Sequence, residues 1–319
     1  MDVDLDSPDW DTLYYSEIVD SVTYIDLESS DDAMIGKISD LDYNGSRIVV
    51  LDDKTGLVKM FDKDGRYISQ IGARGQGPEE YLRAKNVDIK DSVVAVFDIA
   101  LNKVLLYGTN GQFCGADSIG TAEDFSQISS SGVSGYLIAD YSTLPNKKGG
   151  IRFVSHDGSD RMLKERMDAI NNNHLWEIFK NAGEVSVITQ DYEYTILKLD
   201  GDSLSVMYQL NVTPLPSESS KKKIAEHDFN ELISNYSRLF HVDSDRWLII
   251  YFWKKDNPRV VFIDKSKGDV RVCPGLVNDL DKEEVRGRAP VLIDGAMVEY
   301  VDGPDEDSNP RLKLYHLKK

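Results

Sequence analysis

The chain has 319 residues, of which 41% are hydrophobic and 29% charged, a balance that favours a folded protein with a continuous core. Its 55 acidic and 37 basic residues give a formal net charge of -18. Because such a field repels phosphate backbones and anionic lipid headgroups, nucleic-acid and membrane-surface partners are not expected.

The N-terminal segment, residues 1–6, has neither a basic start nor an apolar run, so no signal peptide is expected within this chain, although a removed one leaves no trace. The longest apolar stretch, residues 247–253, is far too short to span a bilayer. No transmembrane segment is therefore predicted.

A repeated pattern begins soon after this segment. Residues 47–65 and 93–111 both contain an apolar strand that ends in aspartate, a short step to a second apolar strand, and a turn that ends in glycine. The equivalent glycines, Gly65 and Gly111, lie 46 positions apart. A four-stranded propeller blade usually takes about 40–50 residues, so this spacing indicates one blade per repeat.

Four further segments follow the same pattern more loosely, at residues 136–158, 185–201, 247–268 and 297–315. Six repeats predict an all-β fold, a six-bladed β-propeller that forms one domain over residues 1–319. The last repeat supplies three strands, and residues 21–27 have the pattern of the missing fourth. We therefore expect an N-terminal strand to close the ring in the last blade.

Residues 216–237 break the β pattern and predict a helical insertion. Ala225, Phe229, Leu232, Ile233 and Tyr236 fall on one face of a helix. This apolar stripe favours a helix that covers the flank of the propeller, with a partner-binding helix as the alternative.

The first third of the chain resembles a known family. The residues that carry the resemblance are Ile35-Gly36-Lys37-Ile38, Asp52, the run from Phe61 to Gly65, and the run from Ile71 through Gly75, Gly77, Pro78 and Glu80 to Tyr81. They are similar to the six-bladed β-propeller lipoproteins of gut Bacteroidetes, whose repeats are like NHL repeats. Glu79 stands where this family commonly has a second glycine in a G-x-G-P-G-E-Y run. The resemblance implies export, a lipid anchor and a place at the cell envelope, and it implies no particular activity.

The repeats place six residues at one equivalent position, the end of the second strand: Asp52, Asp98, Asp140, Gln190, Lys254 and Asp302. Such a ring could bind a cation or a polyol, since hard cations prefer several oxygen ligands. Alternatively, each aspartate accepts hydrogen bonds from backbone N–H groups of its own turn. The second interpretation is favoured, because these bonds need no partner from another blade.

The loop over residues 72–81 is glycine-rich and joins the first blade to the second. Arg74 and Arg83 could pair with a carboxylate or phosphate, and Tyr81 could stack on a ligand. The alternative is a structural crossover in which Glu80 and Tyr81 lock adjacent blades. Similarly, Trp253 beside Lys254 fits either a sugar site or the core.

The predicted ligand contacts lie together on one rim of the propeller and are Arg74, Tyr81, Arg83, Asp98, Gln190, Trp253 and Lys254. No catalytic residue can be assigned, because no Ser-His-Asp, Cys-His or paired-acid arrangement can be assembled from the sequence. The cysteines Cys114 and Cys273 lie outside any CxxC spacing and the five histidines are scattered, so no metal or cofactor is predicted and both cysteines are expected to be buried free thiols.

The sequence thus favours a non-catalytic cell-envelope propeller that binds a glycan, peptide or partner protein at its channel face. The alternative is a metal-assisted lyase or hydrolase at the channel mouth.

Overall fold

The computed structural model describes residues 1–120, 127–130, 135–140, 150–165, 177–181, 184–188, 194–226, 228–281, 291–293, 295–301, 303, 305 and 307–319. In this part of the chain the protein is all-β, with a β-propeller arrangement of antiparallel sheets. Six sheets have four strands each, and in five of them the strands follow one another in chain order. The chain divides into two compact units: unit 1 is Met1–Thr23, Arg166–Glu299 and Leu314–Lys319, and unit 2 is Tyr24–Glu165 and Tyr300–Lys313.

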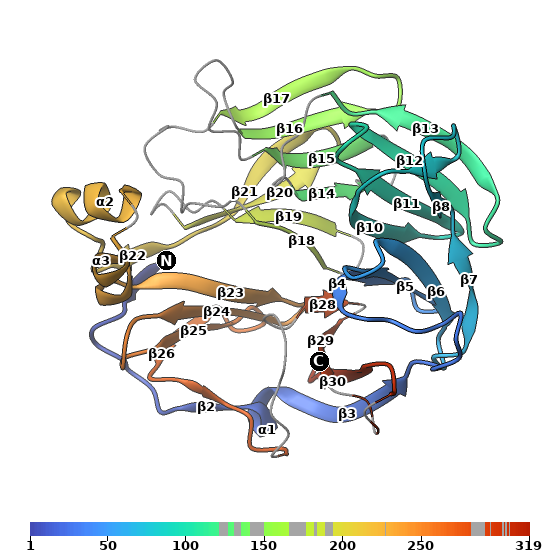
Figure 1. Ribbon diagram of the computed structural model, residues 1–319. Helices are drawn as coiled ribbons and strands as arrows, with labels where there is room; N and C mark the ends of the chain where they lie inside the picture. Colours follow the sequence, from blue (N-terminus) through green and yellow to red (C-terminus); the bar gives the residue numbers. More distant parts are fainter. Residues whose placement is uncertain are drawn as a thin grey trace. The chain divides into compact units, whose positions relative to one another are not determined.

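Unit 2 contains three consecutive four-stranded sheets (Figure 1). The first has β4 (Ile38–Tyr43), β5 (Arg47–Asp52), β6 (Leu57–Asp62) and β7 (Tyr67–Ile71), and the second has β10 (Ala84–Lys90), β11 (Val93–Asp98), β12 (Lys103–Gly108) and β13 (Phe113–Ser118). The third has β14 (Gln127–Ser130), β15 (Gly135–Asp140), β16 (Gly150–Ser155) and β17 (Asp160–Glu165). Five residues in a row are buried in β5 and in β11, as expected for strands covered on both faces.

Adjacent sheets of unit 2 are joined in two ways. Val49 and Leu51 of the first sheet belong to one buried cluster with Val94 and Val96 of the second. In addition, two carboxylates of β4 accept hydrogen bonds from the edge strand β10. Oδ2 of Asp40 accepts a hydrogen bond from the backbone N–H of Val87 at 2.8 Å, and Oδ2 of Asp42 accepts one from Ile89 at 2.8 Å. These bonds satisfy edge N–H groups that would otherwise lack partners.

Unit 1 contains two complete four-stranded sheets and the N-terminal segment. One sheet has β18 (Glu177–Asn181), β19 (Glu184–Ile188), β20 (Thr195–Asp200) and β21 (Ser203–Gln209), and the other has β23 (Ser237–Asp243), β24 (Trp247–Trp253), β25 (Arg259–Asp264) and β26 (Asp269–Cys273). Residues 1–18, here called the N-terminal strap, run along this unit. In the strap, β1 (Asp2–Asp4) pairs in parallel with β22 (Asn211–Thr213), and β2 (Leu13–Tyr14) pairs in parallel with β27 (Leu276–Val277), followed by α1 (Tyr15–Ile18).

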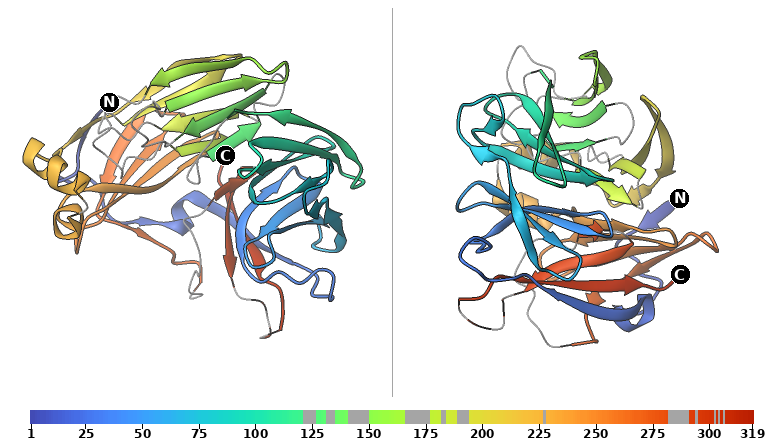
Figure 2. Two further views of the ribbon diagram at one scale, coloured as in Figure 1. Left: turned by 45° about the horizontal axis from the view of Figure 1, so that its top comes forward. Right: turned by 90° about the vertical axis from the view of Figure 1, so that its right-hand side faces the viewer.

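The sixth sheet combines the two ends of the chain. Its order is β28 (Val291–Ile293), β29 (Ala296–Val301), β30 (Arg311–Leu317) and β3 (Val19–Asp26). The strand expected at residues 21–27 is β3, which lies next to β30, as Figures 1 and 2 show. The division between the two units falls within β3, β29 and β30.

The helical insertion differs from the expected single helix. It consists of α2 (Glu218–Ala225) and α3 (Phe229–Ser234). The chain starts a new helix at Asp228, whose side chain accepts a hydrogen bond from the backbone N–H of Glu231. The expected stripe is therefore divided between two helices. Phe229 of the expected stripe is 68% exposed, whereas Tyr236 is buried, and Ile224, outside the stripe, is a buried residue of α2.

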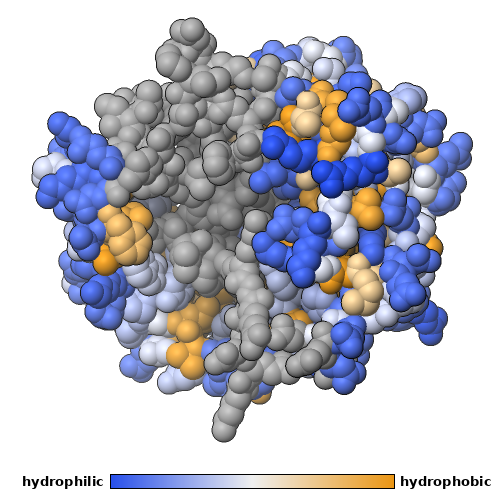
Figure 3. All heavy atoms as spheres, in the orientation of Figure 1, coloured by the Kyte–Doolittle hydropathy of each residue, from blue (hydrophilic) through white to orange (hydrophobic). Residues whose placement is uncertain are grey.

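The cysteines and the surface are also partly as expected. Both cysteines are free, but Cys114 is exposed and Cys273 alone is buried, because Cys114 lies in the outer strand β13. No helix in the described residues is long and apolar enough to cross a membrane. Figure 3 shows mostly hydrophilic residues on the described part of one face, with smaller hydrophobic areas between them.

A short crossover, β8 (Ala73–Arg74) paired with β9 (Glu80–Tyr81), links the first two sheets of unit 2.

The N-terminal strap is held in the core of unit 1 by Leu5. This side chain is completely buried, and its carbonyl oxygen accepts hydrogen bonds from the Tyr236 hydroxyl at 3.1 Å and from Nε of Arg259 at 2.6 Å. The strap therefore belongs to the hydrophobic core and is not a loose tail.

We expect Leu5→Ala to lower the free energy of unfolding by about 2–5 kcal/mol, because it leaves a cavity in this cluster. The control is Leu215→Ala, since Leu215 is 43% exposed and its truncation should cost about 0.5 kcal/mol or less. Denaturant titration of both variants measures the difference. Equal effects of the two substitutions would show that the strap does not contribute to the core.

Candidate functional site

The aspartates at the ends of the second strands of the first two repeats are structural. Oδ1 of Asp52 accepts hydrogen bonds from the backbone N–H groups of Gly36, Lys37 and Lys54 at 3.0–3.1 Å, and Oδ2 accepts one from the Thr55 hydroxyl at 2.7 Å. Both this side chain and that of Asp98 are completely buried. The bonds from Lys54 and Thr55 match the interpretation in which each aspartate orders its own turn, whereas those from Gly36 and Lys37 come from the segment before β4.

Asp98 has the same arrangement in the second repeat. Its carboxylate accepts hydrogen bonds from the backbone N–H groups of Arg83, Ala100 and Leu101 at 3.3, 2.8 and 3.0 Å, and a further one from Leu82. A carboxylate surrounded in this way has little capacity left for a ligand. Gln190, Asp302 and the side chain of Asp140 lie outside the described residues.

The crossover between the first two sheets is ordered by Tyr81. Its side chain is fully buried, and its hydroxyl accepts a hydrogen bond from Val58 N–H at 3.0 Å and donates one to the Ile71 carbonyl at 3.2 Å. Burial raises the pKa of Tyr81 to about 12. Glu80 contributes as well, since its Oε2 accepts a hydrogen bond from Gly77 N–H at 2.8 Å. These contacts fit the structural crossover rather than a stacking platform.

The two arginines of this region are accessible. Arg74 is exposed, and its guanidinium donates from Nε to the Leu82 carbonyl at 3.3 Å and from Nη1 to the Thr55 carbonyl at 3.5 Å. Arg83 is exposed too. The backbone N–H of Arg83 donates to the buried carboxylate of Asp98, and both arginines belong to unit 2.

The remaining predicted contacts belong to unit 1. Lys254 is half-buried, with its ammonium 4.4 Å above the Tyr236 ring and 3.9 Å from Oδ1 of Asp6. Trp253, at the end of β24, is half-buried as well. Lys254 therefore contacts the N-terminal strap. Because the predicted residues are divided between two units, their common rim stays a prediction.

A cavity that was not predicted lies at the other end of the same sheet. It has a volume of about 690 Å³ and belongs entirely to unit 1. We call it the hairpin-end pocket, because its walls are three hairpin turns and the end of β30. It is lined by Ser244, Asp245, Arg246, Lys265, Ser266, Gly295, His316, Leu317, Lys318 and Lys319. In β24 and β25, Trp247 pairs with Asp264 at this end, whereas Trp253 lies at the opposite end, about 20 Å away along the strand.

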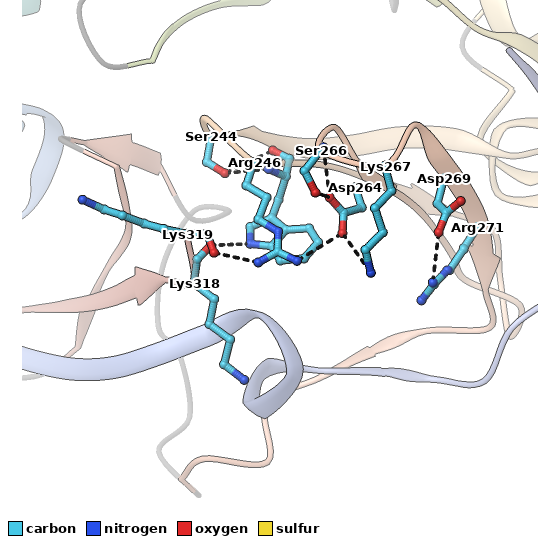
Figure 4. A network of polar contacts seen from close by, with 10 residues as sticks. Ser244, Arg246, Asp264, Ser266, Lys267, Asp269, Arg271, Lys318 and Lys319 are labelled. Carbon is cyan, nitrogen blue, oxygen red and sulfur yellow. Dashed lines mark hydrogen bonds and ion pairs between the residues drawn. The ribbon is translucent and has the colours of Figure 1, made fainter.

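Arg246 is the best-ordered cation of the hairpin-end pocket (Figure 4). Its guanidinium lies 4.1 Å above the Trp247 ring, donates from Nη1 to the main-chain oxygen of Lys319 at 2.6 Å, and donates from Nη2 to Oδ2 of Asp264 at 3.2 Å. Trp247 adds a hydrogen bond from Nε1 to the Lys318 carbonyl at 2.8 Å. These contacts fix the end of β30 against the β23–β24 and β25–β26 turns.

Asp264 stays ionised beside this arginine. Burial by itself would raise the pKa of Asp264, but hydrogen bonds from Ser266 and Arg246 outweigh it, so the pKa lies below the ordinary value. Lys265 similarly pairs with the buried Asp243 and donates to the Ser244 carbonyl at 2.5 Å. The pocket wall is therefore built from charged groups in fixed positions.

The remaining polar side chains of the wall also have partners. Ser244 Oγ accepts from Trp247 N–H at 3.0 Å, and Ser266 Oγ donates to Asp264 at 2.5 Å. Nε2 of His316 forms a hydrogen bond with the Thr23 hydroxyl at 2.7 Å. Within the described residues, no group of three or more His, Cys, Asp or Glu side chains is placed to bind a metal.

Sequence reasoning missed this pocket because its residues come from four separate segments. The repeat comparison followed the ends of the second strands, while the pocket is at their starts. One signal was available in the sequence: basic residues, Arg246 and Lys265, stand in the two turns that flank the β24–β25 pair. In the structure the two turns are in contact, since the backbone N–H of Lys265 donates to the Arg246 carbonyl at 2.8 Å. Basic residues in two such turns must be neighbours.

Fold and pocket together define a β-propeller protein with a polar pocket at the hairpin end of its blades. A family model described as a domain of unknown function, DUF4934, matches residues 2–300, and the chain belongs to this family. No curated protein matches the sequence.

Two solved structures from Bacteroides have a similar fold. One is a putative exported protein from Bacteroides fragilis, with a TM-score of 0.73, 15% identity, and coverage of 100% of this chain and 99% of that chain. The other is a member of the DUF4221 family from Bacteroides vulgatus, with a TM-score of 0.57, 10% identity, and coverage of 94% and 97%. At these identities the likeness shows the fold.

The Asp52 contacts predict a specific acid response. Burial would raise the pKa of Asp52, but hydrogen bonds from Thr55 and from three backbone N–H groups outweigh it, so the pKa lies below the ordinary 3.8. Its stabilising effect is therefore complete above pH 3.8 and is lost as the pH falls through the folded-state pKa. We expect Asp52→Asn to be less stable at pH 7 and to lose less stability between pH 5 and pH 2 than the unchanged protein.

Chemical denaturation at a series of pH values measures this difference. Asp31→Asn is the control, because Asp31 is exposed and makes no hydrogen bond within the described residues. An Asp52→Asn profile parallel to that of the unchanged protein contradicts the assignment.

The structural role of Tyr81 predicts the effect of removing its hydroxyl. Tyr81→Phe should lower the free energy of unfolding by about 1–3 kcal/mol, because Val58 N–H and the Ile71 carbonyl lose a buried partner. Tyr67→Phe serves as control, since the Tyr67 hydroxyl makes no hydrogen bond within the described residues. Thermal or denaturant unfolding compares the two, and a neutral Tyr81→Phe would leave the hydroxyl available for a ligand.

Proposed function

We propose that this protein is an exported, cell-envelope β-propeller that binds a ligand without transforming it. The full-length likeness to a putative exported protein from Bacteroides fragilis supports the location. The six four-stranded sheets, with β3 next to β30, support a ring of six blades closed by the N-terminal strand. A lipid anchor upstream of this chain belongs to the same proposal.

The hairpin-end pocket is the observation that carries the binding role. A concave site of about 690 Å³ is within the size range of small-molecule pockets. Its wall is preorganised, because the Trp247 ring, the main-chain oxygen of Lys319 and the Asp264 carboxylate hold Arg246 at the same time. A glycan, a peptide or an exposed segment of a partner protein can occupy such a site.

The hydroxyl groups of this pocket support binding over nucleophilic catalysis. Ser244 and Ser266 use their Oγ atoms within their own turns, and His316 forms its hydrogen bond with Thr23 rather than with a serine of the pocket. A serine nucleophile needs a base within hydrogen-bond reach. The side chains of this wall therefore determine the shape and the charge of the pocket.

The rim predicted from the repeats is a second proposed contact region. Of its residues, Arg74, Arg83 and Lys254 are the ones with charged groups at or near the surface, and Gln190 belongs to the same proposal. Its contribution is separable from that of the hairpin-end pocket, because Lys254 lies at the opposite end of the β23–β26 sheet.

The experiment screens the purified chain against glycan and peptide libraries and follows each hit by calorimetry and mass spectrometry. We expect a hit that is recovered unchanged and whose affinity falls at least about tenfold in Asp245→Tyr, which fills the pocket beside the exposed Asp245. Lys255→Tyr, at the opposite end of the sheet, is the matched control and should retain binding.

Two outcomes would overturn the proposal. Turnover of a hit, in particular turnover abolished by a chelator, would establish the metal-assisted lyase or hydrolase instead. Hits that lose affinity in Arg74→Ala or Lys254→Ala, but not in Asp245→Tyr, would move the binding site to the predicted rim.

A further inference from the structure

The hairpin-end pocket has the opposite charge to the protein as a whole. Five cationic side chains, Arg246, Lys265, Lys267, Lys318 and Lys319, line or adjoin it. The side-chain carboxylates of Asp243, Asp245 and Asp264 lie beside them, and Lys319, the last residue of the sequence, adds a main-chain carboxylate that contacts Arg246. The chain has a formal net charge of -18, so a local excess of positive side chains is a departure from its general composition.

Ion pairing within the wall does not remove this excess. Arg246 and Lys267 share the single carboxylate of Asp264, with Nη2 at 3.2 Å and Nζ at 3.9 Å. Lys318 donates from Nζ to the neutral carbonyl of Ser16 at 2.8 Å, a hydrogen bond that leaves its charge uncompensated. Lys319 is exposed and has no ion pair within the described residues.

The cations have different positions around the pocket. Figure 4 shows Arg246 between the end of β30 and Asp264, while the side chains of Lys318 and Lys319 point in different directions from the end of this strand. Arg246 and Lys265 are thus both held in fixed geometry, Lys265 by its ion pair with Asp243, and Lys318 and Lys319 supply a surrounding field. The hydrogen bonds from Arg246 to Lys319 and Asp264 use one hydrogen on each Nη, which leaves further donors on its planar group.

We infer that the ligand of the hairpin-end pocket carries an oxyanion, either a carboxylate or a phosphate group. This inference rests on the proposed binding function and adds the ligand class. A guanidinium held flat on an aromatic ring presents its donors in the plane that suits a carboxylate or phosphate. The field of the flanking lysines concentrates such anions against the repulsion of the remaining acidic surface.

The experiment measures calorimetric affinity for three probes: trigalacturonate, which carries carboxylates; inositol hexakisphosphate, which carries phosphates; and the neutral maltotriose. We expect one of the two anionic probes to bind and maltotriose to bind at least tenfold more weakly. Affinity should fall as salt is raised from 50 to 300 mM, because accessible charges are screened. Whichever anionic probe binds identifies the source of the oxyanion.

Two variants with the same change in net charge locate the effect. Lys319→Glu, in the pocket, should weaken the anionic probe by about five- to tenfold, whereas Lys255→Glu, at the opposite end of the sheet, should leave its affinity within about twofold. Both residues are exposed, so both variants should fold, which unchanged melting temperatures would establish. Arg246→Gln then tests the direct contact, with the melting temperature again measured beside the affinity.

The outcomes separate this inference from the proposed function. Equal losses in Lys319→Glu and Lys255→Glu, or the absence of binding by either anionic probe, would overturn the oxyanion assignment. A neutral library hit that loses affinity in Asp245→Tyr would also overturn it, while leaving the binding function intact.

Discussion

Hydrogen bonds from backbone N–H groups to buried carboxylates hold this structure together at the places where strands end or lack a neighbour. Asp52 and Asp98 each accept such bonds both from their own turns and from the segment that leads into the same sheet. Asp40 and Asp42 accept them from the edge of the next sheet. A buried N–H without a partner costs about 1–3 kcal/mol, so these side chains decide whether sheet ends can be buried at all. Part of the acidic composition is therefore architectural.

This use of aspartate changes where a ligand can bind. A carboxylate whose lone pairs are occupied by backbone donors is a poor ligand for a cation. This holds even where the repeats predict a ring of such carboxylates at equivalent positions. Cations in turns and at strand ends remain accessible, such as Arg74 in unit 2 and Lys319 in unit 1. Turn residues can vary without disturbing the core, and a fold shared by many proteins acquires its particular function at such positions.

The hairpin-end pocket depends on contacts of the same kind as the core beneath it. Trp247 stacks on Phe262 with ring centroids 4.9 Å apart, and the Arg246 guanidinium lies over the Trp247 ring. The buried aromatic pair fixes the ring, and the ring fixes the guanidinium. Stability and recognition are thus coupled at Trp247, so a change there would disturb the pocket and the core of unit 1 together.

The sequence by itself determined the all-β fold, the blade-length repeat, the N-terminal strand β3 and the structural role of Asp52, because all of these follow from short-range patterns of strands and turns. Three features became visible only in the tertiary structure. The insertion forms two helices, the Tyr81 hydroxyl is hydrogen-bonded to Val58 and Ile71, and a basic pocket exists at the start of β24. The physical reason is separation along the chain: Arg246 meets Lys319 across 73 positions. No local pattern records such a meeting, since it depends on which sheet ends the packing of unit 1 brings together.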